Sequence, residues 1–245
     1  MEWIIHRYET LDTTMREAAG RAERGEPAGT VVVAAEQTAG RGRLGRRWES
    51  ERGAGLYCSL VLRPAGPAAE APVVTLALGL AAARAIEQVS GVACDLRWPN
   101  DVLIGGRKCC GILVEMSADG DLVRHVVAGI GVNVNQTRFP EEVAETATSL
   151  RMQTGREWAV ETLLEALLQE VDRHLGAMVE QGSRTIVEWF ARASTYAAGR
   201  RVAVMNGATE IQGVTAGLSE TGVLLLERED GRVEPVLAGS VRPVE

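Results

Sequence analysis

The stretch TVVVAAEQTAGRGRLGRRWESERGAGLYCSLVLRP covers residues 30–64 and predicts two apolar strands joined by a long loop. The strands, at residues 30–36 and 56–64, are rich in valine and leucine, and runs of this length bounded by glycine are typical of buried strands. Between them, GRGRLGRRW at residues 40–48 interleaves glycine with arginine, a composition that no regular element favours. Loops of this length are usually functional or disordered.

Apolar periodicity on both sides of this stretch predicts an α+β chain. The expected strands are residues 3–8, 30–36, 56–64, 95–98, 102–104, 108–116 and 122–135, and the expected helices are residues 13–24, 73–89, 158–181 and 183–193. The pair Gly105-Gly106 predicts a tight turn between two of the strands.

Beyond residue 198 the chain changes to short apolar runs separated by turn pairs. These pairs are Asn206-Gly207, Thr221-Gly222 and Asp230-Gly231, which favour hairpins. We therefore expect residues 1–197 to form one domain and residues 198–245 to form a small β-barrel. A unit this small buries little apolar surface, so we expect it to pack against its neighbour.

Composition excludes several classes of protein. The formal net charge of −7 and the pI near 5.2 give a surface that repels polyanions and anionic membranes. The N-terminus does not resemble a signal peptide, and no uninterrupted apolar run is long enough to span a membrane, so we expect a cytoplasmic protein. Four cysteines without CxxC spacing and three scattered histidines indicate neither a zinc site nor a disulfide framework.

The chain contains a single lysine. Of its 26 lysine and arginine residues, only Lys108 is lysine. A coding bias toward arginine explains the general pattern, and chance could explain the exception. A lysine, however, carries a compact ammonium where arginine carries a bulkier planar group. The exception can therefore also indicate a function that needs the smaller cation.

The loop at residues 40–48 has the chemistry of an anion site. Glycines let backbone amides approach a ligand, and arginines offer planar donors to phosphate or carboxylate. The loop is neither a P-loop nor a GxGxxG turn. On this segment alone, two other interpretations remain open. The loop could be a solvated basic loop, or an Arg-Gly-Arg segment that inserts into a nucleic-acid minor groove.

Two further segments combine polar groups with apolar strands. In RWPND, residues 97–101, Asn100 and Asp101 offer oxygen ligands to Mg²⁺ or a nucleotide, although a polar turn would have the same composition. In GRKCCGILVE, residues 106–115, Lys108 begins an apolar strand and Gly111 leaves room for a flat ligand.

Taken in this order and spacing, the three segments resemble the catalytic domain of biotin protein ligases. That family has a GRGRxGRxW loop, a [KR]WPND turn and an RKxxGILxE strand, which stand here as GRGRLGRRW, RWPND and RKCCGILVE. The resemblance implies a mixed-sheet catalytic domain of the biotin/lipoate ligase superfamily, followed by an SH3-like barrel. Because residue 1 lies close to the first substrate motif, we expect no N-terminal DNA-binding domain and no binding of DNA.

The resemblance also implies the reaction and its partners. Biotin and MgATP form biotinyl-5′-AMP, and the biotinyl group then passes to a lysine of a biotin carboxyl carrier protein. The substrates and cofactors expected are biotin, ATP and Mg²⁺, with no membrane partner, and a homodimer is consistent with the family.

The resemblance also implies which residues form the site, because each family motif matches particular positions of this sequence. The expected catalytic residues are Lys108, Arg43 and Arg46. The expected biotin contacts are Thr13, Thr14, Gln37, Gly40, Arg41, Gly42, Arg43, Lys108, Gly111 and Leu113. The expected ATP or adenylate contacts are Arg43, Arg46, Arg47, Trp48, Asn100, Gly131, Asn133 and Arg242. The expected Mg²⁺ ligands are Asn100 and Asp101. The segment DTTM at residues 12–15 departs from the family's DSTN, with Thr13 for serine and Met15 for asparagine.

Two alternative functions remain open. Lipoate or octanoate attachment shares the fold superfamily, but its ligases lack the GRGRxGRxW loop, and its transferases need a cysteine from a later strand, whereas no cysteine follows Cys110. A nucleic-acid-binding module is disfavoured by the acidic balance and by the absence of aromatic residues from 199–245.

Overall fold

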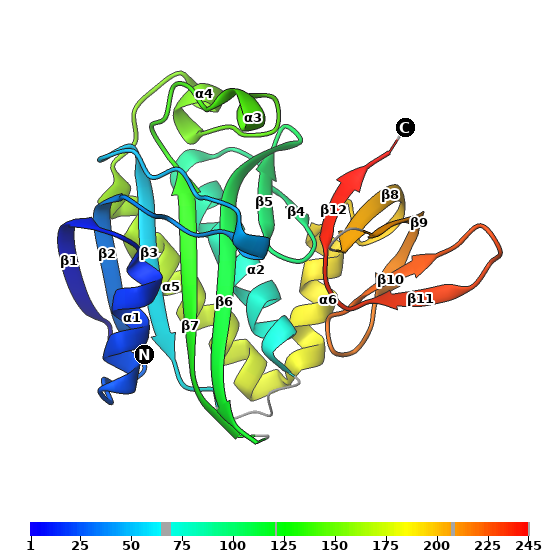
Figure 1. The fold of residues 1–245 in the computed structure, drawn as a ribbon, viewed down its shortest axis with the longest axis horizontal. Coiled ribbons are helices and arrows are strands. Elements are labelled where there is room, and N and C mark those ends of the chain that lie inside the picture. The colour runs from blue at the N-terminus through cyan, green and yellow to red at the C-terminus, as the bar shows by residue number, and fades with distance from the viewer. Residues whose placement is uncertain (65–69, 121, 207–208, 245) are drawn as a thin grey trace.

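The computed structural model describes residues 1–64, 70–120, 122–206 and 209–244 as a seven-stranded sheet with helices on both faces and a smaller sheet beside it (Figure 1). The large sheet contains β1 (Ile4–Leu11), β2 (Thr30–Gln37), β3 (Gly55–Leu62), β4 (Asp95–Arg97), β5 (Asp101–Ile104), β6 (Arg107–Asp119) and β7 (Leu122–Asn133). Its strand order is β1-β2-β3-β7-β6-β5-β4. Strands β1 and β2 run parallel and the other described pairs run antiparallel, so the sheet is mixed, as predicted.

The helices divide between the two faces of this sheet. Helix α1 (Thr14–Glu23) covers one face, and α2 (Ala71–Ser90), α5 (Val160–Gln181) and α6 (Ser183–Ala193) cover the other. The four predicted helices are thus confirmed. The sequence did not predict the short helices η1 (Arg43–Gly45), α3 (Glu141–Ala144) and α4 (Leu150–Thr154).

Strands β1 and β2 run parallel, so the chain must cross back over the sheet between them. Helix α1 forms this crossover. The Thr13 side chain caps the helix by accepting a hydrogen bond from the Met15 amide, as a good N-cap residue does. On its sheet face, α1 buries Met15, Ala18 and Ala22 against Val32, Val61 and Val127. The packing of α1 therefore holds the DTTM segment against β3 and β7.

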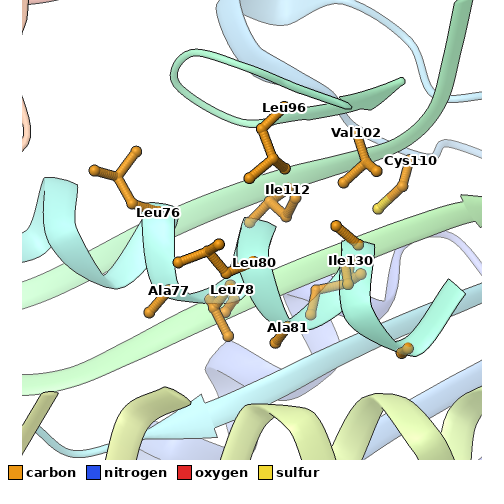
Figure 2. Packing of buried hydrophobic residues seen from close by; sticks show 14 of the residues in the cluster. Leu76, Ala77, Leu78, Leu80, Ala81, Leu96, Val102, Cys110, Ile112 and Ile130 are labelled. Atoms are coloured by element: carbon orange, nitrogen blue, oxygen red, sulfur yellow. The ribbon is translucent and has the colours of Figure 1, made fainter. Parts of the chain in front are cut away.

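The core lies between α2 and the sheet. Figure 2 shows Leu80 of α2 beside Ile112 of β6, and both side chains are buried. Burial of each such side chain stabilises the fold by about 1.5–3 kcal/mol. Helix α2 is long and apolar enough, by length and composition, to cross a membrane, but 67% of its most apolar window is buried within the protein. The sequence had indicated no such segment, and α2 packs here as a core helix.

Several predicted boundaries differ from the structure: β1 and β6 each run three residues further than expected, to Leu11 and Asp119. The strand expected at residues 122–135 ends at Asn133, and the helix expected from residue 158 begins at Val160. Between the two elements, the Asn135 side chain donates to the Trp158 carbonyl and accepts from the Trp158 amide. The first bond uses the Trp158 carbonyl, which a helix that began at residue 158 would have used as an acceptor.

The C-terminal strands form a separate antiparallel sheet, consistent with an SH3-like barrel. It contains β8 (Ala198–Asn206), β9 (Thr209–Leu218), β10 (Leu224–Glu227), β11 (Val233–Val236) and β12 (Ser240–Pro243), in the order β11-β10-β9-β8-β12. The predicted turn at Asn206-Gly207 falls partly outside the described residues, because Gly207 is not among them. The turns at Gly222 and Gly231 have positive φ, as glycine allows.

This sheet packs onto the first. Its buried Val202 and Leu224 belong to the same apolar cluster as Leu96, and the Trp98 indole donates to the Gly222 carbonyl at 2.9 Å. Strand β8 begins at Ala198, the residue at which we placed the second domain. The division into two domains stays a prediction.

Candidate active site

A pocket opens between α1, the loop of residues 41–48 and strands β6 and β7. Its lining residues are Thr13, Thr14, Met15, Gln37, Arg41, Gly42, Arg43, Trp48, Cys58, Asn100, Lys108, Gly111, Ile112, Leu113, Gly129, Ile130 and Gly131. The arginine loop, the RWPND turn and the lysine strand therefore meet at one place.

The loop folds back on itself above the sheet. Arg41 pairs with Arg47 in an isolated antiparallel bridge, the Gly42 amide donates to the Arg46 carbonyl, and the Trp48 amide donates to the Gly40 carbonyl. A side chain on Gly40 would lie 2.4 Å from the Trp48 carbonyl oxygen, so this approach requires glycine. The loop thereby presents Arg41 and Arg43 at the pocket.

Three glycines on adjacent strands form the floor of the pocket. Gly111 of β6 pairs with Gly131 of β7, and Gly129 lies two residues along β7 on the same face. The Trp48 indole lies on Gly131, where a Cβ would be 2.5 Å from the ring. Its Nε1 is buried and has no hydrogen-bond partner among the described residues. The floor is therefore a flat trough with room for side chains or a ligand above it.

Lys108 lies at the start of β6 beside this trough. Its Nζ is 2.5 Å from Asp101 Oδ1 and 5.3 Å from the centre of the Trp48 ring. The other carboxylate oxygen of Asp101 accepts from Arg97 at 2.7 Å. Asp101 thus connects the RWPND turn to the lysine and fixes its position.

The Asp101 carboxyl predicts a pH dependence of stability. Burial alone would raise its pKa, but the charges of Lys108 and Arg97 and their hydrogen bonds hold that pKa below its ordinary value of 3.8. A carboxyl with a depressed folded-state pKa stabilises the fold above the unfolded value, and this stabilisation is lost as pH falls through the folded pKa. We expect the urea midpoint of the protein to fall more steeply below about pH 3.8 than that of Asp101→Asn. Equal acid slopes for the two proteins would contradict this assignment.

Arg43 links the pocket to the C-terminal sheet. Its Nη1 donates to Asn100 Oδ1 at 3.0 Å and to the Gly239 carbonyl at 3.2 Å. Burial lowers the pKa of Arg43, the charge of Asp101 acts in the opposite direction, and Arg46 adds to the lowering. The guanidinium remains charged, since arginine titrates far above neutral pH. The C-terminal sheet therefore helps to hold a cation at the pocket.

Hydroxyl and amide groups gather where α1 meets the pocket. The Gln37 side-chain carbonyl accepts from the Thr14 amide and hydroxyl, and its Nε2 donates to Ser50. Ser59 donates to the Thr14 hydroxyl at 2.8 Å. This network orients Thr14 and Gln37, and each keeps further capacity for a polar ligand.

Most of the predicted contact residues line this pocket. They are Thr13, Thr14, Gln37, Arg41, Gly42, Arg43, Trp48, Asn100, Lys108, Gly111, Leu113 and Gly131. Sequence reasoning did not select Met15, Cys58, Ile112, Gly129 and Ile130. Met15 and Ile112 lie in the quoted segments DTTM and GRKCCGILVE, whereas nothing in the sequence marked Cys58.

Five predicted contacts are not among the lining residues, namely Gly40, Arg46, Arg47, Asn133 and Arg242. The Asn133 amide donates to the Thr148 carbonyl in a buried position. Arg242 is paired with Glu210 on the C-terminal sheet. Arg47, Asn133 and Arg242 have protein partners in this conformation, and the roles of all five residues toward a ligand stay proposals.

The predicted magnesium ligands also have partners. Asn100 Oδ1 accepts from Arg43, and both Asp101 oxygens pair with cations. Across the residues that the structure describes, no three His, Cys, Asp or Glu side chains are grouped to hold a metal ion. The contacts thus make Asp101 a counter-ion in this conformation.

The cysteines beside Lys108 are poorly placed to act as nucleophiles. Cys109 and Cys110 are fully buried, and burial raises the pKa of both thiols. A thiol with a raised pKa forms little of the reactive thiolate. Their position favours a packing role.

A glycine-floored trough with hydroxyl and amide groups at one end and fixed cations at the other fits one class of protein. It is the class of enzymes that hold an acidic ligand next to a phosphate group, because fixed cations offset the repulsion between two anions. The mixed sheet and the small C-terminal sheet supply the scaffold of this site.

The chain belongs to the biotin/lipoate A/B protein ligase family, whose model matches residues 8–133. It is 38% identical to the bifunctional ligase/repressor BirA of Bacillus subtilis over 91% of this chain and 69% of that protein. It is 36% identical to the biotin–[acetyl-CoA-carboxylase] ligase of Paracoccus denitrificans over 82% of this chain and 85% of that one. The solved biotin protein ligase from Aquifex aeolicus in complex with biotin and ATP superimposes with a TM-score of 0.84 at 33% identity, covering 98% of this chain and 99% of that one.

Proposed function

We propose that this chain is an ATP-dependent biotin protein ligase. The observation that carries the proposal is the position of its one lysine, Lys108, in a pocket that also contains Arg43 and the glycine trough. A relative named as a biotin ligase aligns over 82% of this chain, and a structure solved with biotin and ATP superimposes over 98% of it. They favour biotin over lipoate or octanoate as the acid.

In the first half-reaction a carboxylate oxygen of biotin attacks the α-phosphorus of ATP. The bond to the bridging oxygen breaks, pyrophosphate leaves with its electrons, and biotinyl-5′-AMP forms. Two anions must approach, so cations that are already in place lower the barrier. We assign Lys108 to the reacting oxygens, and Arg43 and Arg46 to the phosphates.

In the second half-reaction the amine of an acceptor lysine attacks the acyl carbon of biotinyl-5′-AMP. The acyl–oxygen bond breaks, AMP leaves, and the amine nitrogen loses a proton to solvent. Lys108 stays beside the departing phosphate, because its pairing with Asp101 fixes Nζ at this end of the trough. The acceptor that we propose is a biotin carboxyl carrier domain, encountered in the cytoplasm.

We assign the remaining predicted ATP contacts to the nucleotide. Trp48 offers a flat ring above Gly131, and Arg47, Asn133 and Arg242 would need to exchange their present partners to reach it. Mg²⁺ enters with ATP as part of the substrate, and Asn100 is our candidate contact to it.

Biotin-dependent exchange of labelled pyrophosphate into ATP tests the function directly. We expect exchange with biotin and none above background with lipoate or octanoate. Exchange that is faster with lipoate than with biotin would replace the proposal with the lipoate alternative.

The single lysine leads to a prediction about self-labelling. Biotin ligases can release their reactive adenylate, which then acylates exposed amines. Here the terminal amine of Met1, which pairs with Asp172 at 2.9 Å, is the one amine outside the pocket. After long incubation with biotin and ATP without acceptor, we expect mass spectrometry to find biotin at Met1 alone, and label at another residue would refute this.

A further inference from the structure

Met15 closes one end of the glycine trough. The side chain is 4% exposed and lines the pocket. Its sulfur lies directly over Gly129, where a Cβ would be 2.7 Å from Sδ and 3.1 Å from Cγ. The next neighbour of that Cβ would be Ser59 Oγ, at an ordinary 3.6 Å. Met15 is thus the close contact that restricts the space above Gly129.

The opposite end of the trough belongs to the cations. A Cβ on Gly111 would lie 2.9 Å from Lys108 Nζ and 3.0 Å from the Trp48 ring. Gly111 pairs with Gly131, and Gly129 lies about 7 Å from Gly131 along the same face of β7. An acid with its carboxylate beside Lys108 therefore places its ring system over Gly129, against Met15.

We propose that Met15 determines which ring system this enzyme accepts, by setting the depth of the pocket above Gly129. This inference rests on the proposed biotin ligation. The thioether neither donates nor accepts a strong hydrogen bond, so it acts by shape and apolar contact. The polar ureido ring of biotin contacts Thr14 and Gln37, and its sulfur-containing ring packs on Met15.

The contact between Met15 and Gly129 gives a size-exchange test. Gly129→Ala puts a methyl group into the space of the Met15 sulfur, whereas Met15→Ala empties that space. In the double variant the new methyl group meets only Ser59 Oγ among these neighbours. The two substitutions should therefore compensate each other, as contacting residues do in a double-mutant cycle.

The experiment is steady-state pyrophosphate release with biotin and with desthiobiotin, which keeps the ureido ring and carboxylate but lacks the sulfur ring. For Met15→Ala we expect KM for biotin to rise at least about tenfold with kcat within about threefold, since uniform binding is lost. The KM for desthiobiotin should change less than about threefold, because the missing ring is the one that Met15 contacts. Gly129→Ala should raise KM for biotin more than about 100-fold, and the double variant should return it to within about tenfold of wild type.

Met178→Ala is the matched control, because it makes the same truncation on α5, on the other face of the sheet. Its two KM values should equal those of wild type, and thermal unfolding checks that every variant folds. An unchanged KM for biotin in Met15→Ala, an equal rise for both acids, or a folded double variant that binds no better than Gly129→Ala would overturn the inference. If Gly129→Ala does not fold, a double variant that remains more than about tenfold above wild type overturns it. Wild-type protein without biotin-dependent pyrophosphate release would instead refute the proposed function, and this inference with it.

Discussion

Lys108→Arg is expected to slow adenylate formation at least about 100-fold, roughly 2.7 kcal/mol of barrier, although it keeps the positive charge. The Lys108 ammonium lies in contact range of Asp101, Gly111 and Trp48. A guanidinium is larger and planar, so it would crowd the trough where the reacting oxygens meet. Single-turnover formation of biotinyl-5′-AMP measures the effect without contributions from product release.

The control for this substitution is Arg107→Lys. It makes the reverse exchange at the neighbouring position of β6, where the side chain points to the opposite face of the strand. We expect it to keep the wild-type rate. A rate within about tenfold of wild type for Lys108→Arg would show that charge alone suffices and that the geometric role is wrong.

Asp101→Asn is expected to lower the free energy of unfolding by about 3 kcal/mol at neutral pH. Asp101 is the carboxylate between Lys108 and Arg97, and its side chain is 15% exposed. Removing the negative partner leaves two nearby cations uncompensated, and breaking such a partly buried pair is costly. Urea unfolding followed by circular dichroism measures the loss, and the adenylation rate should fall as well, because Lys108 loses its orienting contact.

Asp230→Asn serves as the comparison for Asp101. Asp230 pairs with Arg232 on the C-terminal sheet at 3.4 Å, with both side chains largely exposed. Exposed pairs contribute little to stability, so we expect a change below about 0.5 kcal/mol. Equal losses for the two variants would show that Asp101 has no special role as a counter-ion.

Local pattern was sufficient for most elements. The apolar runs at residues 30–36 and 56–64 became β2 and β3, and Gly105-Gly106 became a turn with positive φ at both glycines. Periodicity and glycine chemistry act within a few residues, so they can be read without a structure. The helices at Glu141–Ala144 and Leu150–Thr154 were missed because one turn of helix carries too little periodicity.

The order of three motifs along the chain identified the family and selected Lys108, because each motif keeps its residues within one loop or strand. Tertiary structure alone decided what those residues touch. The pairing of Lys108 with Asp101, the contact of Arg43 with the Gly239 carbonyl and the position of Met15 over Gly129 depend on strand register and on helix and sheet packing. Such contacts join residues that are distant in sequence, and no local propensity specifies the distance between them.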